Sequence, residues 1–74
     1  MKKEDFQFMI DSKKEFEFVY NGIKYNLTYG KDSEGKEYIN FGRLYEGKNY
    51  YSYKDLMNNA KIENHFFKDM IEIL

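Results

Sequence analysis

The sequence predicts one α+β domain over residues 1–74, with a short N-terminal helix, a three- to four-stranded antiparallel sheet, and two C-terminal helices packed on one face of the sheet. Two alternating polar and apolar runs flank Asn21-Gly22, and apolar residues recur at helical spacing near both ends of the chain. Tyr and Phe make up a fifth of the residues. Each such ring buries roughly 150–250 Å², so even this short chain can build a core.

The first predicted element is a helix over Glu4 to Asp11. Phe6, Met9 and Ile10 fall at positions i, i+3 and i+4 among charged neighbours, which is typical of an amphipathic helix. Phe8 points away from this stripe. A helix of two turns is marginal alone, so we expect its stripe to dock on other elements.

A β-hairpin follows, with arms over Glu15 to Tyr20 and Ile23 to Tyr29. Asn-Gly between two alternating runs indicates a two-residue type I′ turn, and such a turn fixes the register of both strands. The apolar side chains then gather on one face, with Tyr20 opposite Ile23, Phe18 opposite Tyr25, and Phe16 opposite Leu27. A slip by one residue would bring charged side chains into the core, so the register is strongly specified.

The third predicted strand runs from Glu37 to Tyr45, after a polar turn bounded by glycines. Beyond Gly42 the apolar residue Leu44 falls on the alternate face, so we expect a bulge at this glycine. A brief fourth strand is expected near Asn49 to Tyr51.

Two helices complete the predicted fold. Ser52 followed three residues later by Asp55 is a capping pattern that predicts a helix ending near Ala60. Asn64 is a good N-cap for a last helix running to Leu74. Its apolar sector spans nearly half of its circumference: Phe66, Phe67, Met70, Ile71, Ile73 and Leu74. Such a sector either contacts a partner or packs against the sheet and a neighbouring helix together.

The composition argues against several function classes. The chain has no Cys, a single histidine, His65, and balanced charge, with 12 Lys or Arg against 13 Asp or Glu. The chain therefore lacks the residues for a thiolate metal site, offers one histidine for a nucleophilic triad, and has no charge excess for a strongly charged nucleic-acid face. We expect no enzyme activity, no cofactor, no small-molecule ligand and no membrane span, and a cytoplasmic location.

Two binding hypotheses remain. Tyr and Arg are over-represented at protein interfaces, and the wide apolar sector of the last helix favours contact with another protein or with a second copy as a homodimer. Phe66, Met70 and Ile73 are the predicted contact residues. The alternative is nucleic-acid binding through Tyr38, Arg43, Lys48 and Tyr50, in which rings stack on bases and cations follow phosphates. Acidic residues interspersed in that segment make nucleic acid the less favoured partner.

The run from Glu15 to Tyr25, the segment Tyr53 to Leu56 and the closing amphipathic stretch resemble small uncharacterised proteins of low-GC bacteria and their phages. The resemblance implies the same order of elements. The order of one helix, three strands and two helices also resembles some phage anti-CRISPR proteins, but the near-neutral charge departs from the acidic surface that such inhibitors often use as a DNA mimic.

Overall fold

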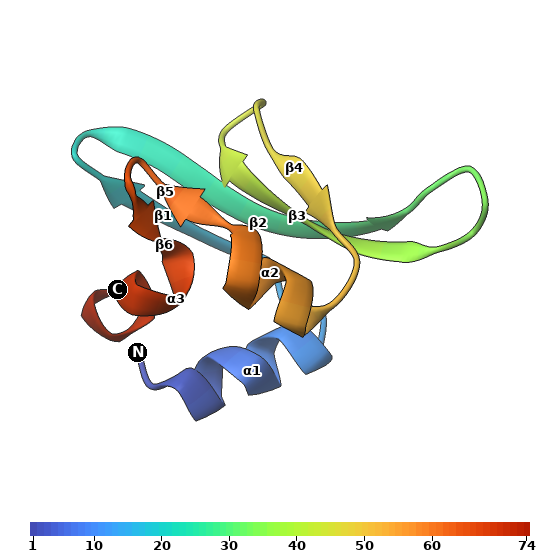
Figure 1. Ribbon diagram of the computed structural model, residues 1–74, viewed down its shortest axis with the longest axis horizontal. Helices are drawn as coiled ribbons and strands as arrows, with labels where there is room; N and C mark the ends of the chain where they lie inside the picture. Colours follow the sequence, from blue (N-terminus) through green and yellow to red (C-terminus); the bar gives the residue numbers. More distant parts are fainter.

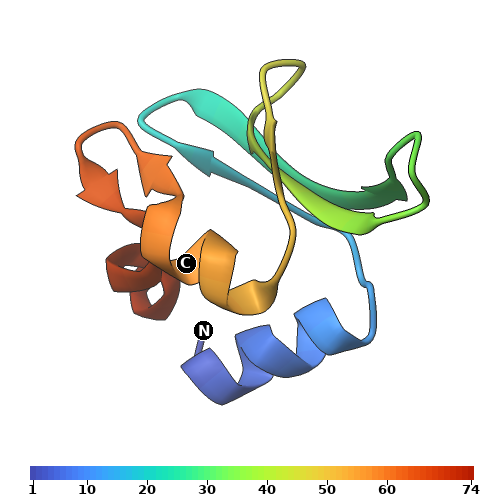
Figure 2. The ribbon, with the colours of Figure 1, turned by 45° about the vertical axis from the view of Figure 1, so that its right-hand side comes forward.

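Four antiparallel strands form one layer of the computed structural model, which describes residues 1–74 (Figure 1). The strands are β1 (Phe16–Tyr20), β2 (Ile23–Lys31), β3 (Glu37–Arg43) and β4 (Lys48–Tyr50). Each strand pairs with the next along the chain, so β1 and β4 are the sheet edges. Helices α1 (Lys3–Asp11), α2 (Tyr53–Asn59) and α3 (Phe67–Met70) lie on one side of the sheet (Figure 1 and Figure 2). The predicted α+β class is confirmed.

The β1–β2 hairpin has the predicted register. Asn21 and Gly22 adopt positive φ angles of 52° and 75°, as both central residues of a type I′ turn must. The facing pairs are those expected: Tyr20 with Ile23, Phe18 with Tyr25, and Phe16 with Leu27. The turn fixes the register, and the alternation of both arms then places these side chains on the side of the sheet that the helices cover.

Strand β3 contains no bulge, contrary to the prediction. Pairing with β2 continues through Gly42, which faces Asn26, and through Arg43, which faces Tyr25. A Cβ atom at position 42 would lie 2.9 Å from the Cα atom of Gly47. Gly42 is therefore required because the β3–β4 turn folds back closely over the strand. Leu44 lies in this turn, although its N–H still donates to the Lys24 carbonyl at 3.0 Å.

Helix α2 begins as the capping pattern predicts. The Ser52 hydroxyl accepts a hydrogen bond from the Asp55 backbone N–H at 2.9 Å, and the Asp55 carboxylate accepts one from the Tyr51 N–H at 3.0 Å. The helix ends at Asn59, one residue before the predicted Ala60. Leu56 and Met57 are its buried residues.

The last helix forms within the predicted range of Asn64 to Leu74, but it is much shorter than predicted. A short hairpin occupies the predicted first turn, with β5 (Lys61–Ile62) paired to β6 (His65–Phe66), and only α3 and the 3₁₀ turn η1 (Ile71–Ile73) follow. The Phe67 N–H donates to the Ala60 carbonyl at 2.9 Å, which anchors the hairpin at its base. This arrangement buries Ile62 and Phe67 together, so long-range packing overrides the local capping signal.

The core lies between the sheet and the helices. Its largest fully buried side chains come from every layer: Phe6, Leu27, Phe41, Leu56, Ile62, Phe67 and Ile71. The Phe67 ring stacks on Phe41 with centroids 4.2 Å apart and meets Phe6 edge-on at 5.3 Å. The two chain ends meet beside α1, because the N-terminal ammonium donates to the Leu74 carbonyl at 3.0 Å (Figure 2). None of the helices combines the length and the apolar character needed to cross a bilayer.

Candidate functional site

A pocket of about 350 Å³ opens where the β3–β4 end of the sheet faces the end of α2 and the β5–β6 hairpin. We call it the Tyr25 pocket. The residues that line it are Tyr25, Phe41, Gly42, Arg43, Glu46, Lys48, Tyr50, Asn59, Lys61 and Glu63. One wall therefore comes from β2, β3 and β4, and the other from residues 59–63.

Sheet register explains the first wall. Tyr25 faces Arg43 across β2 and β3, and Phe41 faces Lys48 across β3 and β4. Directly opposed residues point to the same face of a sheet, so Arg43 and Lys48 share the helix-covered face with the buried rings of Tyr25 and Phe41. The two cations thus border the core at the point where the cover of α2 ends.

Tyr25 carries a buried hydroxyl without a hydrogen-bond partner. The residue is 2% exposed, and its ring stacks on Phe18 with centroids 5.4 Å apart and on Phe41 with centroids 6.2 Å apart. A buried hydroxyl without a partner is costly, since it has lost its hydrogen bonds to water.

The cations of the Tyr25 pocket are free of ion pairs. The ion pairs of the protein join Lys13 to Glu37 and Lys24 to Glu17, and neither includes Arg43, Lys48 or Lys61. Of the two carboxylates in the pocket, Glu63 accepts hydrogen bonds from the Asn21 amide at 3.2 and 3.4 Å. The Glu46 carboxylate forms no hydrogen bond or ion pair, although its backbone N–H donates to the Arg43 carbonyl at 2.8 Å. The three cations leave the pocket with a positive excess over the two carboxylates.

Tyr50 stands at the β4 side of the pocket as a neutral hydroxyl. Partial burial, and secondly the nearby Asp55 carboxylate, raise the pKa of this phenol above its ordinary value. Tyr50 therefore offers both a ring face and an O–H donor at neutral pH.

The structure gathers three of the four residues of the nucleic-acid hypothesis. Arg43, Lys48 and Tyr50 line the Tyr25 pocket, whereas Tyr38 lies on the opposite face of the sheet. There its ring covers Gly30 and meets Tyr51 edge-on with centroids 6.4 Å apart. Tyr38 therefore does not belong to this group, contrary to the prediction. Sequence reasoning assigned Tyr25 to the core but had no signal for its unpaired hydroxyl.

The three residues of the predicted protein contact do not share one face. Phe66 is 39% exposed on β6 and Ile73 is 70% exposed on η1, but Met70 is 6% exposed and belongs to the core. The prediction failed for Met70 because the helix is shorter than expected: α3 turns Met70 toward the core, while Phe66 lies before it on β6 and Ile73 after it on η1. Phe66 lies beside the Tyr25 pocket, since it pairs with Lys61 in the β5–β6 hairpin.

Comparisons of the chain with protein-family models, with curated proteins and with solved structures gave no match. His65 is exposed on β6 and forms no ion pair, including with Asp69. No three potential metal-ligating side chains of His, Cys, Asp or Glu lie close enough together to hold a metal ion.

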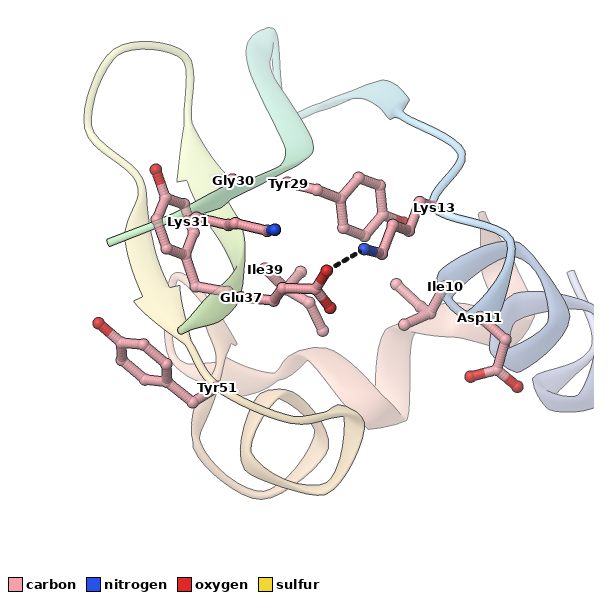
Figure 3. A pocket seen from close by; sticks show the side chains of 10 residues that line it. Ile10, Asp11, Lys13, Tyr29, Gly30, Lys31, Glu37, Ile39 and Tyr51 are labelled. Carbon is pink, nitrogen blue, oxygen red and sulfur yellow. Dashed lines mark hydrogen bonds and ion pairs between the residues drawn. The ribbon is translucent and has the colours of Figure 1, made fainter. Parts of the chain in front are cut away.

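A second hollow, of about 430 Å³, lies between the end of α1 and the β2–β3 end of the sheet (Figure 3). Lys13 and Glu37 reach toward each other across it and form an ion pair at 2.6 Å, while Ile10 and Ile39 form its apolar part. The hydrogen bond from Lys13, and its charge, lower the pKa of Glu37. This hollow is thus already occupied by a pair of mutually satisfied charges, unlike the Tyr25 pocket.

Tyr29 lies at the wall of this second hollow. We expect its ionisation to lower the stability of the fold at alkaline pH. Its hydroxyl donates to the Lys14 carbonyl at 2.8 Å, and burial, followed by the Glu15 charge, raises its pKa from 10.0 to about 12. The folded state holds the phenol protonated after the unfolded chain has begun to ionise. The contribution of Tyr29 is therefore complete below pH 10 and is lost as the pH rises through 12.

Urea unfolding of the wild type and of Tyr29→Phe, followed from neutral pH to pH 12, checks this expectation. The wild type should lose more of its unfolding free energy above pH 10 than the variant does. Parallel pH curves for the two proteins would contradict the assignment, because other tyrosines are present in both.

Proposed function

We propose that this chain is a small non-enzymatic binding module that contacts another protein. The proposed surface combines the Tyr25 pocket with Phe66 on the adjoining β5–β6 hairpin. The observation that carries the proposal is that Lys61 belongs to both: it lines the pocket, and its ammonium lies 5.0 Å from the centre of the Phe66 ring. An exposed ring and a charged pocket thus form one continuous surface.

The chemistry of this surface supports a protein partner. Lys68 approaches the Phe66 ring as well, with its ammonium 5.5 Å from the ring centre, so two cations flank one exposed aromatic side chain. Aromatic and Arg side chains carry much of the energy of protein interfaces, and Phe66, Tyr50 and Arg43 supply both kinds here. Neighbouring charged groups then restrict which partners fit.

Substituting Phe66 tests the proposal. Phe66→Lys should abolish capture of the partner from cells that naturally make the protein, because it replaces the exposed ring with a third cation. Phe8→Lys is the matched control, since Phe8 is also an exposed aromatic residue, at 69%, but lies on α1. Circular dichroism establishes that both variants fold. A partner captured equally by wild type, Phe66→Lys and Phe8→Lys would contradict the proposed surface.

A second copy of the chain is one partner that the same surface could take. Sedimentation equilibrium of the wild type and of Phe66→Lys measures this directly. A homodimer through the proposed surface should dissociate in Phe66→Lys and persist in Phe8→Lys.

Nucleic-acid binding, including action on a host nuclease in the manner of an anti-CRISPR protein, is the second candidate. It is favoured by Arg43, Lys48 and Tyr50 sharing the Tyr25 pocket. It is opposed by Glu46 and Glu63 in the same pocket. Titration with single-stranded RNA and DNA at increasing salt tests whether the chain binds nucleic acid directly, because phosphate contacts weaken steeply with salt. Absence of binding even at low salt would remove it.

We also propose a cytoplasmic location in a bacterium or one of its mobile elements. The support is compositional, since short exported domains commonly depend on disulfides and this chain has no Cys. Fractionation of cells that make the tagged protein measures the location.

A further inference from the structure

We infer that the Tyr25 pocket binds an oxyanion, namely a side-chain carboxylate from an acidic segment of the partner. This inference rests on the proposed protein-binding function and deepens it by giving the chemistry of the partner. Three features of the pocket carry it: a buried hydroxyl without a hydrogen-bond partner, three cations that form no ion pair, and a sheet edge beside the opening.

The buried hydroxyl without a partner is that of Tyr25. It is enclosed by protein and has no acceptor, although two carboxylates line the same pocket. The Tyr25 ring packs in the core, where it stacks on Phe18 and Phe41. An oxyanion entering the pocket would supply the missing acceptor, and hydrogen bonds to charged acceptors are stronger than those to neutral ones.

The three cations of the pocket favour an anionic ligand over a neutral hydrogen-bond acceptor. Arg43 lies directly opposite Tyr25 in the β2–β3 register, so its guanidinium and the Tyr25 hydroxyl project from neighbouring positions on one face. Lys48 projects from the next strand and Lys61 from the facing wall. None of the three has an ion-pair partner in the protein. A guanidinium is suited to bind a carboxylate through two parallel hydrogen bonds.

The position of the pocket favours a peptide as the source of the carboxylate. The pocket opens beside β4, an edge strand whose outer side pairs with no other strand. An extended segment can align along such an edge by backbone hydrogen bonds while one of its side chains enters a neighbouring pocket. The volume of about 350 Å³ lies within the range of specific ligand sites and accommodates a Glu side chain with part of its backbone.

Titration with capped peptides tests the inference on the whole chain. The probes are an oligoglutamate peptide, an oligoglutamine peptide of equal length, and inorganic phosphate, each followed by amide chemical shifts in ¹H–¹⁵N spectra. Oligoglutamate should shift the amide signals of the pocket residues and bind more tightly than either other probe. Equal binding of oligoglutamine, or binding of phosphate without oligoglutamate, would overturn the assignment.

Two variants and two controls assign the binding to the pocket. Tyr25→Phe and Arg43→Gln should each weaken oligoglutamate binding about tenfold, the loss expected for one hydrogen bond to a charged group. Tyr45→Phe removes a hydroxyl from a residue that is 95% exposed, and Lys36→Gln removes a cation from the β2–β3 turn. Both controls should bind as the wild type does, and an equal loss in a control would overturn the inference.

The failure of this inference is distinguishable from failure of the proposed function. If capture of the partner depends on Phe66 but Tyr25→Phe changes neither capture nor oligoglutamate binding, the oxyanion assignment alone is wrong. If Phe66→Lys retains every captured partner, the proposed function fails whatever the peptide titrations give.

Discussion

Phe67→Ala is expected to leave the chain largely unfolded at 25 °C. Phe67 is fully buried, and its ring contacts rings from three other elements: Phe6 of α1, Phe18 of β1 and Phe41 of β3. Removing a buried Phe costs about 3–5 kcal/mol, and a core of this size rarely supplies more than about 3–5 kcal/mol of net stability. The single substitution therefore removes as much free energy as the whole domain contributes.

The adjacent residue is the control for this prediction. Phe66→Ala deletes the same side chain from a partly exposed position, so the free energy of unfolding should change by less than about 1 kcal/mol. Far-UV circular dichroism and thermal unfolding of the two variants measure the difference. A cooperative transition of Phe67→Ala close to that of Phe66→Ala would show that the ring cluster is not the centre of the core.

This pair of variants also tests the part of the fold that the sequence predicted least well. Local chemistry was sufficient for the β1–β2 hairpin, because Asn21-Gly22 permits positive φ at both turn positions and the flanking alternation admits one register. It was sufficient for the start of α2 as well, where Ser52 and Asp55 form the predicted cap. Both features are decided by residues within a few positions of one another.

The C-terminal segment is decided by contacts between distant residues. Asn64 and the apolar residues after it have the pattern of a capped amphipathic helix, and nothing local marks Glu63-Asn64 as a hairpin turn. The alternative gains the stacking of Phe67 on Phe41 and the burial of Ile62. Gly42 was misread for a similar reason, since the close approach of Gly47 that requires it is a tertiary contact.

The alternation of side chains along β3 is sufficient to predict which residues of the candidate site share one face of the sheet. Tyr38 and Arg43 are five positions apart in an unbroken strand, so they must point to opposite faces. The expected bulge at Gly42 concealed this. The unpaired state of Tyr25 was beyond sequence reasoning, because whether a buried hydroxyl finds an acceptor depends on every element packed around it.

Tyr25→Phe is expected to stabilise the free protein by about 1 kcal/mol. The substitution removes only the buried hydroxyl that lacks an acceptor, and it leaves the ring and its stacks on Phe18 and Phe41 in place. An unsatisfied buried polar group costs about 1–3 kcal/mol, and its removal recovers part of that cost. Urea unfolding at neutral pH, monitored by circular dichroism, measures the change.

Tyr29→Phe also removes one tyrosine hydroxyl, but we expect it to lower the free energy of unfolding. The Tyr29 hydroxyl donates to the Lys14 carbonyl at 2.8 Å, so its removal should destabilise the protein by about 0.5–1.5 kcal/mol. Destabilisation by Tyr25→Phe of similar size would mean that the Tyr25 hydroxyl has an acceptor in solution, and would contradict its role as a donor available to a ligand. Stabilisation of Tyr25→Phe together with weaker oligoglutamate binding would instead identify a hydroxyl that reduces the stability of the fold and contributes to binding.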